Sequence, residues 1–70
     1  MGFRIYLRNF GGRDGYLEVN LAGAEIVADF ENYLRGEQFI VRSYPLKEGE
    51  GSLTIDFHEV LAIRAIRYAR

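Results

Sequence analysis

The sequence predicts a single small α+β domain, residues 1–70, in which about five antiparallel strands form a sheet and one amphipathic helix covers one of its faces. Two observations predict this class. Hydrophobic side chains recur at every second position through most of the chain, but at helical spacing in one central segment. In addition, 70 residues can enclose only one core, and without cysteine that core cannot rely on disulfides or thiolate metal sites.

The first two segments are predicted to form a β-hairpin. Residues 3–8 alternate strictly between apolar and polar side chains, and residues 16–21 repeat this alternation. The segment 11–15 between them contains three glycines and interrupts the pattern. Its Asp14-Gly15 pair is typical of a tight hairpin turn, because both residue types tolerate positive φ.

Residues 24–35 are predicted to form the helix. From Ile26 onward, apolar side chains fall at i, i+1, i+4, i+7 and i+8, which is one stripe along a helical surface. Glu25 places a negative charge near the N-terminus, where the helix dipole favours it. Gly36 follows the last helical residue and can adopt the left-handed conformation that ends many helices.

Three more strands are predicted in the second half of the chain. Residues 39–44 are rich in β-branched and aromatic side chains and are followed by Pro45. Residues 52–57 alternate again, a short bend is expected at residues 58–59, and a last strand at residues 61–68. The predicted order is therefore ββαβββ, without an internal repeat or a domain boundary.

A single helix covers one face of such a sheet, so the other face is the candidate binding surface. Strict alternation places mainly arginine and tyrosine side chains on it. The candidate binding residues are Arg4, Tyr6, Arg8, Ile40, Arg42, Tyr44, Arg64, Ile66 and Tyr68. The same alternation places Tyr16, Glu18, Thr54, Asp56 and His58 on this face.

This arginine–tyrosine surface has three interpretations. It is a protein interface, including one for self-association, because tyrosine and arginine are enriched at interfaces. Alternatively it binds single-stranded nucleic acid by stacking and phosphate contacts, or it is an ordinary polar sheet face. Ile40 and Ile66 favour a protein partner, since aliphatic side chains add little to phosphate binding, and the net charge of −1 points the same way.

No catalytic residue, metal or cofactor is predicted. His58 is the only histidine, and although Asp56 is near it in sequence, no serine has matching strand geometry. One imidazole without cysteine does not make a zinc site. Glu48 and Glu50 are interpreted as ordinary loop charges, and the glycine-rich segment 11–15 leads into a strand, unlike phosphate-binding loops, which lead into a helix.

Residues 39–42, 52–60 and 62–64 resemble the second half of Sm-like RNA-binding proteins in the spacing of their strands. In the bacterial branch of that family, a Tyr-Lys-His turn separates the last two strands. Residues 56–58 here read Asp-Phe-His and keep only the histidine. The resemblance implies RNA binding, but it requires a strand at residues 26–34, where the helical period is stronger, so we do not assign the chain to that family.

We therefore expect a non-enzymatic protein-binding module, such as an adaptor, inhibitor or regulator, that self-associates. Short cysteine-free chains of this type occur among accessory and phage-encoded proteins, which is an analogy only. Single-stranded RNA binding on the same face is the alternative. A small-molecule substrate is not expected. No apolar run approaches the roughly 18–20 residues that span a bilayer, and the absence of cysteine is typical of the cytoplasm.

Overall fold

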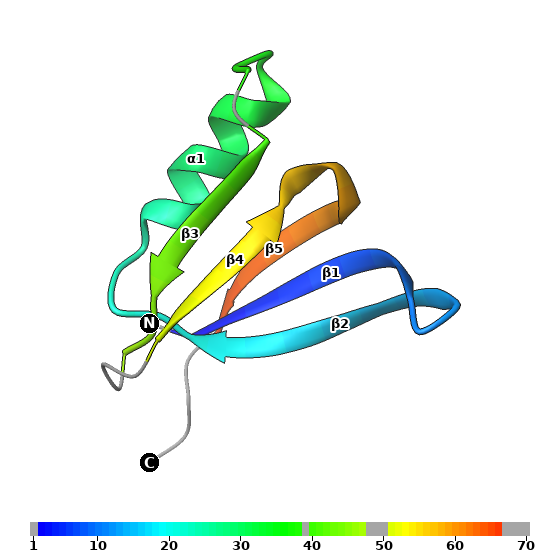
Figure 1. The fold of residues 1–70 in the computed structure, drawn as a ribbon, viewed down its shortest axis with the longest axis horizontal. Helices are drawn as coiled ribbons and strands as arrows, with labels where there is room; N and C mark the ends of the chain where they lie inside the picture. The colour runs from blue at the N-terminus through cyan, green and yellow to red at the C-terminus, as the bar shows by residue number, and fades with distance from the viewer. Residues whose placement is uncertain (1, 39, 48–50, 67–70) are drawn as a thin grey trace.

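The computed structural model describes residues 2–38, 40–47 and 51–66 (Figure 1). Its elements are, in chain order, β1 (Gly2–Phe10), β2 (Arg13–Asn20), α1 (Glu25–Leu34), β3 (Val41–Pro45), β4 (Ser52–Asp56), the 3₁₀ helix η1 (Phe57–Glu59) and β5 (Val60–Ile66). The α+β class and the order ββαβββ are confirmed. All strand pairs in the described ranges are antiparallel, as predicted.

The five strands form two sheets, whereas the sequence predicted one. β1 lies between β2 and β5 in a three-stranded sheet, and β3 pairs with β4 in a separate hairpin. In the part of the chain that the structure describes, an isolated bridge between Leu21 and Leu46 links the end of β2 to the end of β3. The turn of η1 redirects the chain from β4 into β5 (Figure 1). This bend lets the two sheets enclose a shared core, which a flat five-stranded sheet under one short helix would leave half exposed.

The hairpin turn between β1 and β2 lies at Gly11 and Gly12, with φ of 66° and 92°. The prediction that Asp14-Gly15 forms the turn is wrong, because Gly15 is already part of β2, opposite Leu7. The pairing register shifts beyond Leu7, as in a β-bulge. Two consecutive positive φ values favour a Gly-Gly pair, since other residues pay a steric penalty there.

The helix is confirmed at its predicted place, with Ala24 and Arg35 as its capping residues. It runs alongside β3 (Figure 1) and buries Ile26 and Phe30 against the strands. Because residues 26–34 are helical, the strand that the Sm-like resemblance requires is not formed. Within the described ranges, no helix is long and apolar enough to cross a membrane.

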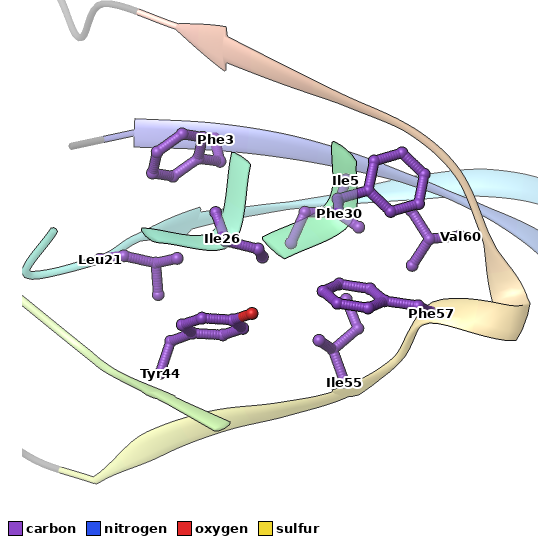
Figure 2. Close-up of a cluster of buried hydrophobic side chains, with 9 residues drawn as sticks. All are labelled: Phe3, Ile5, Leu21, Ile26, Phe30, Tyr44, Ile55, Phe57 and Val60. Atoms are coloured by element: carbon purple, nitrogen blue, oxygen red, sulfur yellow. The ribbon is translucent and has the colours of Figure 1, made fainter. Parts of the chain in front are cut away.

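The core lies between the two sheets and the helix. It consists of Phe3, Ile5, Leu21, Ile26, Phe30, Tyr44, Ile55, Phe57 and Val60 (Figure 2). The ring centroids of Phe30 and Phe57 are 5.5 Å apart at a tilt of 56°, and Tyr33 adds a third ring 5.6 Å from Phe57. Tilted pairs of this kind are favoured by the quadrupoles of the rings. Helix α1 and η1 are therefore joined by an aromatic cluster.

Candidate binding face

Alternation along β1 determines which side chains leave the core. Phe3 and Ile5 are fully buried, so Arg4 and Tyr6 point to the opposite side of the three-stranded sheet. Cross-strand pairing extends this side to the two neighbouring strands. We define the outer face by Arg4, Tyr6, Tyr16, Glu18, Ala62, Arg64 and Ile66. The predicted placement of Arg4, Tyr6, Arg64 and Ile66 on a common face is consistent with this register.

Arg4 is the organising residue of the outer face. Its Nε donates a hydrogen bond of 2.9 Å to Oε2 of Glu18, and its Nη2 forms an ion pair with the same oxygen. Its guanidinium carbon lies 4.7 Å from the ring centroid of Tyr16, a cation–π distance. The Tyr16 ring in turn lies 5.5 Å from that of Tyr6, tilted by 56°. Four side chains from two strands thus hold one another in place.

The electrostatics of this cluster act on the Tyr6 hydroxyl and the Arg4 guanidinium. The pKa of the Tyr6 phenol is lowered, mainly by a hydrogen bond from Arg4. Partial burial of the phenol opposes this shift, and a hydrogen bond from Arg64 adds to it. The pKa of Arg4 is raised, first by its hydrogen bond to Glu18 and then by that to Tyr6. The Tyr6 hydroxyl therefore interacts with two cationic groups, of which the carboxylate of Glu18 neutralises one.

Tyr44 and Arg42 do not lie on the outer face, contrary to the prediction. Tyr44 is only 5% exposed, and its hydroxyl donates a hydrogen bond of 2.7 Å to Oδ2 of Asp29 in α1. Nη2 of Arg42 lies 3.5 Å from the same oxygen. β3 belongs to the second sheet and runs beside the helix, so these side chains meet α1. Burial raises the pKa of the Tyr44 hydroxyl, and the hydrogen bond that it donates to Asp29 adds to this effect.

Ile40 and Arg8 also lie apart from the Arg4 cluster. Ile40 precedes β3, is half-buried, and lines a shallow groove with Tyr33, Leu34, Gly36, Glu37, Gln38 and His58. Arg8 is exposed and donates from Nε to the carbonyl oxygen of His58 at 3.1 Å, so it reaches toward η1. Tyr68 falls outside the described residues. The eight predicted binding residues that the structure describes therefore divide among several places in the molecule.

The residues considered for catalysis have structural partners. Oδ1 of Asp56 accepts a hydrogen bond of 2.9 Å from the backbone N–H of His58, which caps η1. The imidazole of His58 lies edge-on to the ring of Tyr33, 6.0 Å away. In the ranges that the structure describes, no three potential metal-ligating side chains gather. Glu48 and Glu50 lie outside these ranges.

Sequence reasoning placed Tyr16 and Glu18 on the open side but did not include them among the binding candidates. The signal that could have found them is cross-strand pairing, because β2 sets Tyr16 opposite Tyr6 and Glu18 opposite Arg4. The sequence predicted Asp29 on the polar side of the helix. It lies at the border of the apolar stripe, three residues after the buried Ile26, with its side chain 19% exposed and bonded to Tyr44 of β3.

Searches of protein-family models, curated proteins and solved structures found no match to this chain. The function must therefore be argued from the outer face itself. That face can donate hydrogen bonds from two guanidinium groups and two phenols, and it offers ring edges and aliphatic side chains beside them.

Proposed function

We propose that this protein is a non-enzymatic binding module of the cytoplasm that docks a partner protein on its outer face. The observation that carries the proposal is the Arg4 cluster, in which Glu18 fixes the arginine and the arginine stacks over Tyr16. A regulator, adaptor or inhibitor acts by presenting such a surface to its partner.

The ordering of the cluster supports protein binding. Tyrosine and arginine dominate the binding energy of many interfaces, and they do so when they are held in well-packed surroundings. A side chain that is already fixed loses less conformational entropy on association than a free one. Tyr16 combines both properties, since it is 48% exposed yet packed between the guanidinium of Arg4 and the ring of Tyr6.

The charges of the outer face select an acidic partner segment. Arg4 and Arg64 supply two positive charges, and Glu18 is the negative one among the residues that define the face. A carboxylate of the partner near the Tyr6 hydroxyl would accept hydrogen bonds from groups that already converge there. Ala62 and Ile66 lie beside these groups, so the preferred segment combines a carboxylate with apolar side chains.

Single-stranded RNA is the second candidate, because tyrosine rings and arginines on an open sheet can bind bases and phosphates. The geometry favours it less. Arg4 already occupies a face of the Tyr16 ring, and the 56° tilt between Tyr6 and Tyr16 leaves no common plane on which successive bases could stack. Fluorescence polarisation with short RNA oligomers tests this directly. RNA binding predicts an affinity that falls steeply between about 50 and 200 mM salt.

The protein-binding proposal is tested by capture from an extract of the native host, followed by titration of the purified partner. The test variant combines Tyr16→Ser with Arg64→Glu, both on the outer face. The control is Ala28→Glu, which adds a negative charge at an exposed position of α1. Nuclease treatment of the extract separates direct protein binding from capture through RNA.

We expect the control to bind the purified partner like the wild type, and the test variant to bind at least about 30-fold more weakly, since loss of a single hot spot costs about 2 kcal/mol or more. A partner that binds the wild type and the outer-face variant equally contradicts the proposal. Salt-dependent binding of RNA oligomers without any protein partner would establish the alternative instead.

A further inference from the structure

The three-stranded sheet ends in an unusually apolar edge strand. β5 pairs with β1 on one side, and no strand in the described ranges pairs with its other side. Its seven residues, Val60–Ile66, read VLAIRAI and contain one charge, Arg64. Leu61 is 44% exposed although it is a large aliphatic side chain. The unpaired N–H and C=O groups of such a strand are a template for another strand.

The other edges carry the features that normally prevent strand addition. β2, the opposite edge of the same sheet, contains Arg13, Asp14 and Glu18 within Arg13–Asn20. The two strands of the second sheet, β3 and β4, are only five residues long. β3 contains Arg42 and ends in Pro45, and β4 has exposed Ser52, Thr54 and Asp56 along it. Charges and short length protect edges from pairing. β5 lacks these protective features, which indicates that the free edge of β5 pairs with another strand.

The bulge of β5 lies at its beginning and leaves the rest of the strand regular. The register with β1 shifts between the pair of Leu7 with Val60 and the pair of Tyr6 with Ala62, so Leu61 is the additional residue. From Ala62 to Ile66 each residue has one partner in β1. This stretch can therefore accept a second antiparallel strand on its free side.

We propose that β5 pairs antiparallel with β5 of a second copy of this chain, with Ile63 at the two-fold axis. A residue-centred register keeps each side chain on its own face of the sheet. A centre at Arg64 would set two arginines opposite each other, which is destabilising. A centre at Ile63 sets Ile63 against its counterpart on the core side and Arg64 against Ala62 of the second copy on the outer face.

The dimer would form a continuous six-stranded sheet in the order β2-β1-β5-β5-β1-β2. Both outer faces then lie on the same side, so a partner with two acidic segments could bind both at once. The pairing of short strands buries less than the ~1,200 Å² typical of stable interfaces. We expect a reversible dimer with a dissociation constant on the order of 1–100 µM.

The test is sedimentation equilibrium of the full chain alone, from about 1 to about 500 µM, a range that brackets the expected constant. Ala62→Glu sets a carboxylate opposite Arg64 of the second copy, and Ala62→Lys sets an ammonium group there. Since the two-fold axis repeats each pair, we expect the first change to tighten the dimer by about 2- to 30-fold and the second to weaken it by a similar factor. The same two substitutions at Ala28, exposed on α1, should change nothing.

A strict monomer over the whole range, or Ala62 variants that shift the dissociation constant in the same direction, overturns the proposed dimer. An assembly larger than a dimer overturns it as well, because two β5 edges that pair about a two-fold axis leave no β5 edge free for a third chain. Tyr16→Ser alone, without the change at Arg64, leaves β5 intact, so this single variant should dimerise like the wild type while it binds the purified partner more weakly. A failure of partner binding is thereby distinguishable from a failure of dimerisation.

Discussion

Replacing Tyr44 with phenylalanine removes one oxygen and leaves the aromatic ring in the core. In the structure Tyr44 is buried, and its hydroxyl donates to Oδ2 of Asp29 at 2.7 Å. Nη2 of Arg42 lies 3.5 Å from the same carboxylate oxygen. The substitution therefore tests whether β3 turns this side chain toward the helix. If Tyr44 instead faced solvent on an open sheet, loss of its hydroxyl would change the free energy of unfolding very little.

The magnitude follows from the partners that remain. A hydrogen bond to a charged group contributes about 1.5–3 kcal/mol to stability. The Asp29 side chain is 19% exposed and keeps Arg42 after the change, which offsets part of the loss. We expect Tyr44→Phe to lower the free energy of unfolding by about 1–2 kcal/mol, or the melting temperature by roughly 4–16 °C for a domain of this size.

Urea unfolding followed by circular dichroism measures this loss, and a double-mutant cycle assigns it. Tyr44→Phe, Asp29→Ala and the double variant should give a coupling free energy of about 1 kcal/mol or more, since the two side chains touch directly. A coupling near zero, with Tyr44→Phe as stable as the wild type, would refute the inward orientation of Tyr44.

The pH dependence gives a second readout of the same bond. The pKa of Tyr44 is raised in the folded state above its unfolded value of about 10. Its contribution is therefore fully present below about pH 10 and is lost as the pH rises above that value. The stability difference between wild type and Tyr44→Phe should be constant from pH 7 to about pH 9 and shrink above about pH 10. A difference that grows at alkaline pH contradicts the assigned direction.

Three further predictions concern the core, the turn and the outer face. Phe57→Ala removes a fully buried ring between η1 and α1. The expected loss in the free energy of unfolding, about 3–5 kcal/mol, equals the whole stability of a small domain. Circular dichroism should therefore show an unfolded chain at 25 °C, and a folded chain would contradict the core assignment. Gly12→Ala forces a side chain onto a φ of 92° and should cost about 1–2 kcal/mol in urea unfolding, whereas no loss would place the turn elsewhere. In an ultraviolet absorbance titration, one tyrosine should ionise below the usual pKa of about 10. Tyr6→Phe should abolish that transition and Arg4→Gln should raise its pKa, because Arg4 is the main cause of the shift.

The elements with one clear period could be predicted from the sequence. Phe3 and Ile5 belong to a set of alternate positions in β1 that are all apolar, so the inner side of this strand was identified correctly. Ile26 and Phe30 lie four residues apart on the stripe that the helix buries. In both cases the hydrophobic effect admits one orientation only, since rotation or a one-residue slip would expose the whole apolar set.

β3 could not be oriented in this way. Both faces of this strand carry apolar side chains, Val41 on one face and Ile40 and Tyr44 on the other. Alternation therefore does not decide which face is buried. The structure leaves Val41 59% exposed and buries Tyr44. In this orientation the Tyr44 ring packs in the core and its hydroxyl bonds Asp29 of the neighbouring helix. Both are tertiary contacts, which the periodicity of a strand does not reveal.

The turn and the division into two sheets depend on similarly non-local terms. The segment from Gly11 to Gly15 offers both a Gly-Gly and an Asp-Gly turn, and only the pairing of Ile5 with Leu17 selects between the registers. The separation of β4 from β5 follows from η1, a turn of three residues that was predicted as a bend but not as the boundary between sheets.

The most direct test of the outer face is photo-crosslinking of the partner that capture identifies. A photoreactive phenylalanine analogue replaces Tyr16 in one sample and Ala28 in another, and the crosslinked peptides are sequenced by mass spectrometry. Docking on the outer face predicts that position 16 crosslinks to an acidic segment of the partner and that position 28 does not. Crosslinking from position 28 with none from position 16 would contradict the proposed docking site.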